Sequence, residues 1–149
     1  LEIKTDKLFE MIPNSIGYIY NEKCNIKYPI MYSKQPDYYL THDYKDDACK
    51  TGSIFMDYRN TWDDNMIIIY GHNMKDNSMF GDLIKAEVDD TVVIYKNDTK
   101  YEYIVSDIII RDDTDLIYSL ENPYKYKCVV LSTCYEENKR YTVVLKQNY

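Results

Sequence analysis

Residues 128–140 read CVVLSTCYEENKR, and this stretch combines a core-type strand with two reactive side chains. Its first six residues are mostly apolar or β-branched, which is typical of a strand in a protein core. The strand carries a thiol, Cys134, to its polar end, and a guanidinium, Arg140, follows six positions later. A thiol that leaves an apolar strand for a polar segment is partly exposed, so Cys134 is a candidate nucleophile.

A second apolar run, IIIYGHN at 67–73, ends in a similar way, on Gly71 and His72. A cysteine with its ordinary pKa is only ~3% thiolate at neutral pH, so a nucleophilic cysteine needs a neighbouring imidazole or cation. Taken singly, His72 and Arg140 have ordinary structural explanations, as a buried histidine and a solvated charge. Two strands of one barrel can, however, present both Cys134 and His72 at the same rim. We therefore predict that His72 is the proton partner of Cys134 and that Arg140 stabilises the oxyanion.

Composition limits the kinds of partner. The chain has 149 residues, the size of one domain, and a net charge of −7 with no block of Lys and Arg. A nucleic-acid partner is therefore not expected, because phosphate binding needs concentrated basic residues. No apolar run reaches the ~20 residues of a membrane span. The sequence begins at Leu1 rather than at methionine, so we expect a longer protein with any leader or anchor upstream.

The other cysteines and the second histidine have no predicted chemical role. Cys24, Cys49 and Cys128 form no CxxC pair, and a chain of this length does not need disulfides, so we interpret them as free thiols. Cys128 shares a strand face with Cys134, but six residues of extended chain separate the two by ~20 Å, too far for a disulfide. His42 lies in a polar loop. No set of residues has metal-ligand spacing, and no cofactor is expected.

The hydrophobic pattern predicts a mainly-β fold. A short amphipathic helix is expected at 1–12, and short helical turns at 38–41, 78–86 and 115–120. Eight strands are expected at 16–20, 26–32, 52–58, 66–70, 91–96, 100–110, 128–133 and 141–146. Gly17 suggests close backbone approach in the first strand, and Pro29 suggests an edge position for the second. Eight short strands with few helices predict a closed or nearly closed β-barrel.

With these residues in view, the chain resembles the sortases, the cysteine transpeptidases of Gram-positive cell surfaces, and is most similar to class B. The matching stretches are IGYIY (16–20), DYYLTHDY (37–44), GSIFMDYRN (52–60), IIIYGHNMKDNSMFGDL (67–83), LSTC (131–134) and NKR (138–140). Histidine, cysteine and arginine come in that order. Papain-like hydrolases place the cysteine before the histidine, so chain order disfavours that alternative.

The resemblance implies a closed eight-stranded sortase barrel with a short N-terminal helix, formed by a single catalytic domain over 1–149. It also implies an N-terminal membrane anchor outside this sequence and a location on the outer face of the cell membrane. In the implied reaction, Cys134 attacks the Thr carbonyl of a sorting signal in a surface protein and forms a thioester. His72 transfers protons and Arg140 holds the substrate and the oxyanion. An amine of peptidoglycan, or a pilin lysine in the pilus-polymerising alternative, then resolves the thioester.

The resemblance further implies a set of substrate-binding residues: Leu40, Thr114, Tyr118, Ser132 and Thr133. The chain departs from class B in a shorter segment between 110 and 128, in a shorter spacing from cysteine to arginine, and at Pro36, where some relatives have Asn. Because of these departures, the sequence does not decide whether the preferred sorting signal is an NPxTN-like, an LPxTG-like or an (S/P)PxTG-like motif. A catalytically inactive surface-binding module with the same fold is the second alternative.

Overall fold

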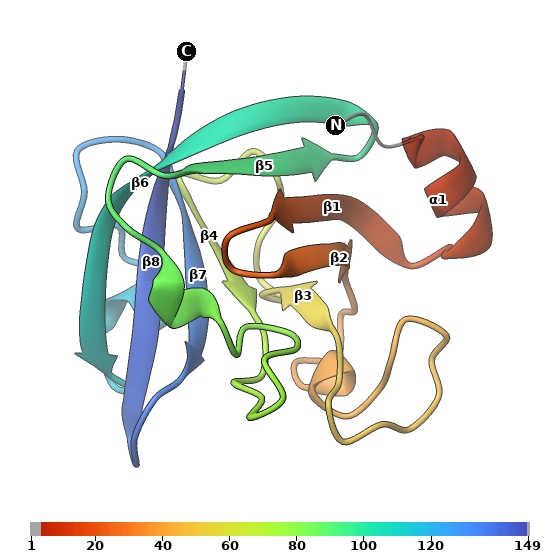
Figure 1. Cartoon of the computed structure of the whole chain (residues 1–149), viewed down its shortest axis with the longest axis horizontal. Coiled ribbons are helices and arrows are strands. Elements are labelled where there is room, and N and C mark those ends of the chain that lie inside the picture. The colour runs from red at the N-terminus through yellow and green to blue at the C-terminus, as the bar shows by residue number, and fades with distance from the viewer. Residues whose placement is uncertain (1–3, 149) are drawn as a thin grey trace.

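The computed structural model describes residues 4–148, and over this range eight strands close into a barrel (Figure 1). The strands are β1 (Ser15–Asn21), β2 (Ile26–Met31), β3 (Ile54–Met56), β4 (Met66–Tyr70), β5 (Thr91–Lys96), β6 (Thr99–Asp112), β7 (Cys128–Cys134) and β8 (Lys139–Gln147). Around the barrel they follow the order β1-β2-β3-β4-β7-β8-β6-β5, and β5 pairs with β1 to close it. The predicted mainly-β, closed eight-stranded barrel is confirmed.

Helices are short, and α1 lies beside β1 at the edge of the molecule (Figure 1). Within the described range they are one α-helix, α1 (Thr5–Met11), and three 3-10 turns, η1 (Tyr38–Leu40), η2 (Leu83–Lys85) and η3 (Leu116–Ser119). Each turn falls within a segment predicted to be helical. Helix α1 covers most of the predicted helix at 1–12, of which residues 1–3 lie outside the described residues. No helix between residues 4 and 148 is long and apolar enough to cross a bilayer.

Strand β4 is buried on both faces, unlike a strand with one solvated face. In β1 burial alternates residue by residue, as expected when one face looks into the core. In β4 the side chains from Met66 to Ile69 are all buried. Ile67 and Ile69 belong to the cluster inside the barrel, whereas Met66 and Ile68 pack in a second cluster with Ile117 of η3. The segment between β6 and β7 therefore covers the outer face of β4.

The edge position predicted for β2 is wrong. The strand lies between β1 and β3. On one side, Pro29 pairs with Tyr18 of β1. On the other side, only Ile30 and Met31 pair with β3. Because the pairing with β3 ends at Ile30, Pro29 has one neighbouring strand rather than two, and a residue without an N–H is tolerated there.

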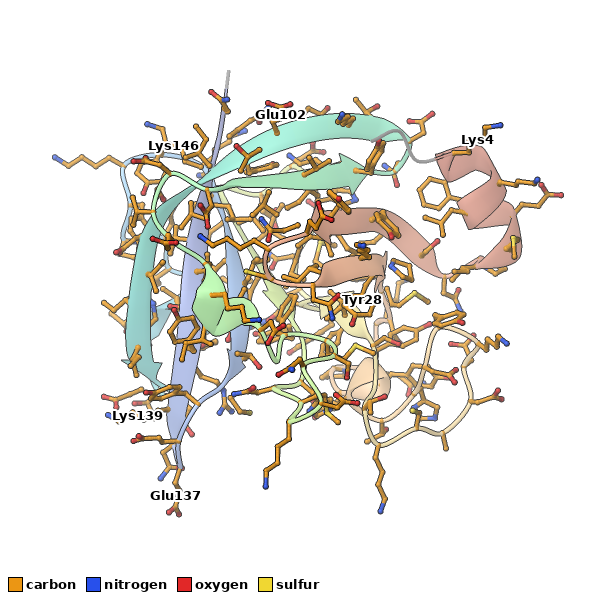
Figure 2. All side chains as sticks on the ribbon, viewed as in Figure 1. Lys4, Tyr28, Glu102, Glu137, Lys139 and Lys146 are labelled. Carbon is orange, nitrogen blue, oxygen red and sulfur yellow. The ribbon has the colours of Figure 1, made fainter. Side chains whose placement is uncertain are left out.

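The three strands that carry the candidate site are neighbours in the barrel. Strands β4 and β7 run parallel, although residues 71–127 lie between them in the chain. Strands β7 and β8 form an antiparallel hairpin. Figure 2 places Glu137 and Lys139, at the turn of this hairpin, at one end of the barrel, and Glu102 and Lys146 at the opposite end. The carboxyl ends of β4 and β7 and the start of β8 thus meet at the end marked by Lys139.

Candidate active site

Strand pairing brings the three predicted catalytic residues to one end of the barrel. Cys134, the last residue of β7, pairs with Arg140 of β8. On the other side of β7, the parallel pairing with β4 reaches Tyr70 opposite Ser132. The strand pairing ends there: beyond it the backbone N–H of Gly71 donates to the carbonyl oxygen of Ser132 at 3.2 Å, and His72 is the next residue. Cys134 is therefore paired with Arg140 of β8 on one side, and His72 lies just past the end of β4, the strand on the other side of β7.

The thiol of Cys134 is exposed and has a cation beside it. Nη1 of Arg140 lies 3.5 Å from Sγ of Cys134. A guanidinium stays protonated at all accessible pH values, so it is a permanent hydrogen-bond donor at this position. The side-chain amide of Asn73 donates to the carbonyl oxygen of Cys134 at 2.8 Å. This hydrogen bond joins the segment after His72 to the backbone of Cys134, a role that the sequence pattern did not reveal.

A backbone carbonyl fixes the protonation of one ring nitrogen of His72. Its Nε2 lies 2.8 Å from the carbonyl oxygen of Leu40. Because a carbonyl oxygen can only accept, this hydrogen bond assigns a proton to Nε2, so in the neutral imidazole Nδ1 is the nitrogen without a proton. The preceding Gly71 allows close packing, since a Cβ there would lie 2.5 Å from Cδ1 of Ile54 and 2.8 Å from the ring of Phe80.

His72, Cys134 and Arg140 border one cavity of about 330 Å³. Four of the five predicted substrate-binding residues also line it: Leu40, Tyr118, Ser132 and Thr133. The hydroxyl oxygens of Tyr118 and Ser132 lie 2.7 Å apart. The hydroxyl of Thr133 is buried and has no hydrogen-bond partner among the described residues. The fifth, Thr114, is exposed and does not border the cavity, whereas its neighbour Asp113 does.

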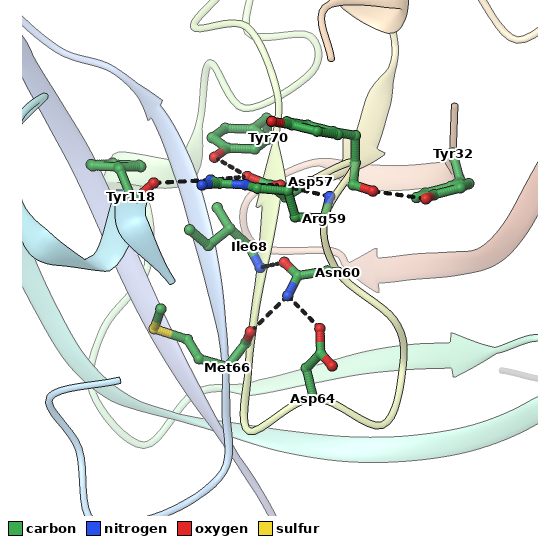
Figure 3. Close-up of polar contacts among 10 residues, drawn as sticks. Tyr32, Asp57, Arg59, Asn60, Asp64, Met66, Ile68, Tyr70 and Tyr118 are labelled. Carbon is green, nitrogen blue, oxygen red and sulfur yellow. Dashed lines mark hydrogen bonds and ion pairs between the residues drawn. The ribbon is translucent and has the colours of Figure 1, made fainter. Parts of the chain in front are cut away.

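A charged network that sequence analysis missed also lines this cavity (Figure 3). The buried carboxylate of Asp57 accepts hydrogen bonds from Nε and Nη2 of Arg59, each at 3.0 Å. The hydroxyl of Tyr70 donates to the same carboxylate at 2.8 Å. The only local signal is a carboxylate directly after an apolar strand, with an arginine two residues later.

The network favours an ionised carboxylate beside a neutral phenol. Burial by itself raises the pKa of Asp57, but the hydrogen bonds from Arg59 and Tyr70 outweigh it, so the pKa lies below the ordinary value. Burial, followed by the negative charge of Asp57, raises the pKa of Tyr70. Near neutral pH, Asp57 is therefore an acceptor for Arg59 and Tyr70 rather than a proton donor.

The remaining cysteines and the second histidine lie away from the cavity. All four cysteines are free, as predicted. Burial raises the pKa of Cys24 to about 11 and that of Cys128 to about 12, so both thiols are protonated at neutral pH. Cys49 is partly exposed in the loop that follows η1. His42 stacks on Tyr38 with ring centroids 4.0 Å apart, and its Nδ1 lies 2.7 Å from the Tyr38 carbonyl oxygen, which gives it a structural role in this loop.

Comparisons with known proteins indicate one family. Sortase B of Listeria monocytogenes (serovar 1/2a) is 53% identical over 66 residues, which are 43% of this chain and only 27% of that protein. The solved structure of sortase B from Listeria monocytogenes is 31% identical, with a TM-score of 0.75 over 96% of this chain and 99% of its own. A Staphylococcus aureus sortase B–substrate complex has a TM-score of 0.78 over 97% of this chain and 84% of its own; at 23% identity this likeness concerns the fold alone.

The match to the family covers most of the barrel. The sequence profile of the Sortase domain matches residues 19–148, a range that contains His72, Cys134 and Arg140. All eight strands of the barrel fall at least partly within that range. The chain therefore belongs to the sortase family and is most similar to the class B sortases.

Proposed function

We propose that this chain is a cysteine transpeptidase that cleaves the sorting signals of surface proteins and joins the new carboxyl end to an amine. The observation that supports it most is the pairing of Cys134 with Arg140, with His72 bordering the same cavity. A thiol, an imidazole and a guanidinium on one cavity supply a nucleophile, a proton carrier and a donor for an oxyanion.

In the first half-reaction, Sγ of Cys134 attacks as a thiolate the carbonyl carbon of the signal's Thr. A C–S bond forms, and the peptide C–N bond breaks when the tetrahedral intermediate collapses. His72, as imidazolium, gives the proton on Nδ1 to the departing amine, because Nε2–H stays bound to the Leu40 carbonyl. Arg140 donates to the carbonyl oxygen while that oxygen is negatively charged.

In the second half-reaction, an amine attacks the thioester carbonyl and the C–S bond breaks. Nδ1 of His72 takes the proton that the amine loses, and Cys134 is released as a thiolate. The amine must compete with water, which requires an ordered acceptor site. We assign the acceptor to an amine of cell-wall peptidoglycan, and a pilin lysine is the alternative.

We assign the signal peptide to the cavity that borders Cys134. Its volume, about 330 Å³, lies within the range of ligand pockets. Leu40, Tyr118, Ser132 and Thr133 would contact the peptide there, and Thr114 would contact it from the exposed loop beside Asp113. Sortase B of Staphylococcus aureus, a protein of the same fold, has been solved as a substrate complex, which supports a substrate as occupant of the site. We also place the protein on the outer face of the cell membrane, held by an anchor outside this sequence.

The test is cleavage of peptides with NPxTN-like, LPxTG-like and (S/P)PxTG-like signals, with mass spectrometry to detect the thioester. Cys134→Ala should form no thioester. His72→Ala and Arg140→Ala should each lower kcat/KM by at least ~100-fold, the usual effect of losing a transition-state donor or a proton carrier. Cys49→Ala is the matched control, because it removes a partly exposed thiol that does not border the cavity.

Other outcomes distinguish the alternatives. Full turnover by Cys134→Ala would exclude Cys134 as the nucleophile. A wild-type protein that forms no thioester with any peptide, and whose Cys134 reacts slowly with thiol reagents, would support the inactive surface-binding module. Transfer to a pilin lysine but not to a wall peptide would identify the pilus-polymerising alternative.

A further inference from the structure

Arg59 joins two loops that border the cavity, and the chemistry above does not use it (Figure 3). Its Nη2 donates to Oδ2 of Asp57 at 3.0 Å and to the carbonyl oxygen of Tyr118 at 2.9 Å. Asp57 and Arg59 lie between β3 and β4, whereas Tyr118 belongs to η3, between β6 and β7. One guanidinium therefore ties the loop 113–127 to the end of β3.

Tyr118 is held at a second point by the strand that carries the nucleophile. Its hydroxyl lies 2.7 Å from Oγ of Ser132 in β7. Ser132 precedes Cys134 by two residues, so both side chains project from the same face of the strand. The backbone of η3 is thus attached to Arg59 and the side chain of Tyr118 to β7, and together these contacts fix one wall of the cavity.

The Asp57 end of this connection is buried and held by several hydrogen bonds. The side chain of Asp57 is 4% exposed and that of Arg59 is 35% exposed. Besides the two side-chain hydrogen bonds from Arg59, the Asp57 carboxylate accepts the backbone N–H of Arg59 at 3.0 Å and the hydroxyl of Tyr70 at 2.8 Å. A buried carboxylate with this many donors holds the guanidinium plane in one orientation, which directs the second N–H of Nη2 at Tyr118.

The contact pattern requires arginine rather than lysine. Arg59 uses Nε and Nη2 for Asp57 and a further N–H of Nη2 for Tyr118. A lysine carries one nitrogen on a flexible stem, so it can keep the charge beside Asp57 but cannot reproduce the fork and the bridge to Tyr118 together.

We infer that Arg59 is a positioning residue that sets how tightly the sorting signal is bound, by holding η3 and Tyr118 against the cavity. It makes and breaks no bonds in the reaction. The inference rests on the proposed function only for the identity of the bound peptide, because the bridge itself is a property of the fold.

The first test is Arg59→Lys. We expect KM for the signal peptide to rise by about 10- to 100-fold, the effect of losing one charge-assisted hydrogen bond, with kcat unchanged within about threefold. Amide hydrogen exchange should become faster in residues 113–127. The rate at which iodoacetamide alkylates Cys134 should stay the same, because this small reagent does not bind through residues 113–127. Lys125→Met, which removes an exposed charge from the same loop, is the control and should change none of these values.

A second variant protects the test against misfolding. The double substitution Asp57→Asn with Arg59→Gln removes both charges, so no buried charge is left without its partner. It should raise KM and loop exchange as Arg59→Lys does. A wild-type KM or wild-type loop exchange in both variants would overturn the inference, as would a fall in kcat at constant KM. If the wild-type protein cleaves no signal peptide, the proposed function fails instead, and loop exchange alone decides whether Arg59 holds η3.

Discussion

At the scale of single residues, burial divides the four thiols into two kinds. Cys24 and Cys128 are 2% and 3% exposed, and burial raises their pKa values to about 11 and about 12. At pH 8, at most about one such thiol in a thousand is ionised. Cys134 is exposed and has Arg140 beside its sulfur. Cys24 and Cys128 are therefore both inaccessible and protonated, so they should be the least reactive of the four thiols.

Alkylation tests this division directly. In the native protein at pH 8, iodoacetamide should modify Cys134 and the partly exposed Cys49, and should leave Cys24 and Cys128 unmodified, because attack needs an accessible thiolate. Mass mapping of peptides from samples quenched at intervals gives the four rates separately. The same reaction in denaturant is the control, in which all four should be modified. Modification of Cys128 as fast as that of Cys134 under native conditions would contradict the division.

At the scale of elements, the sequence predicted strands better than it predicted what joins them. Strands β4 and β7 are short apolar runs, a pattern that predicts a buried strand. The ends of these runs correctly predicted that His72 follows β4 and that Cys134 is the last residue of β7. Strand β3 is shorter than predicted, Ile54–Met56 instead of 52–58. Before it, Gly52 has a positive φ of 61° and the backbone N–H of Ser53 donates to Tyr39 rather than to a neighbouring strand.

The contacts around the site could not be predicted from local pattern. The Leu40 carbonyl that binds His72 and the Tyr118 carbonyl that binds Arg59 are backbone groups, which carry no residue-type signal. Each contact joins elements that are far apart in the chain, so hydrophobic periodicity does not report it. Thr114 is predicted to bind the substrate by resemblance alone; it is exposed and does not border the cavity, so its role stays a prediction.

The seam between β1 and β5, which closes the barrel, gives an element-scale prediction. A Cβ at Gly17 would lie 2.1 Å from the carbonyl oxygen of Tyr95 and 3.1 Å from the ring of Trp62. The predicted close backbone approach at this glycine is thus confirmed. Gly17→Ala must push β1 away from β5, so the free energy of unfolding should fall by about 2 kcal/mol or more.

Urea denaturation followed by circular dichroism measures this loss. Glu22→Ala, at an exposed position just after β1, is the control and should change the free energy of unfolding by no more than about 0.5 kcal/mol. A Gly17→Ala protein as stable as the control would mean that β1 and β5 can move apart at residue 17 without lowering the free energy of unfolding.

At the scale of the whole molecule, several buried groups respond to alkaline pH in the same direction. The pKa values of Cys24 and Cys128 are about 11 and about 12 in the folded state, against ~8.5 in an unfolded chain. Burial also raises the pKa values of Tyr39, Tyr70 and Tyr124. Between the unfolded and folded values, the unfolded chain binds fewer protons than the native protein, so stability falls as pH rises. The net charge of −7 adds self-repulsion as these groups ionise.

We therefore expect the free energy of unfolding to fall by about 1–3 kcal/mol between pH 9 and pH 10.5, less than the full ~1.4 kcal/mol per pH unit for each thiol because nearby solvent screens part of the effect. Urea denaturation at pH 7, 9 and 10.5 measures it. In the double variant Cys24→Ala with Cys128→Ala, stability at pH 7 should be lower, because two buried side chains are shortened, but the fall above pH 9 should be clearly smaller. Parallel curves for the variant and the wild type would assign the alkaline loss to groups other than the buried thiols.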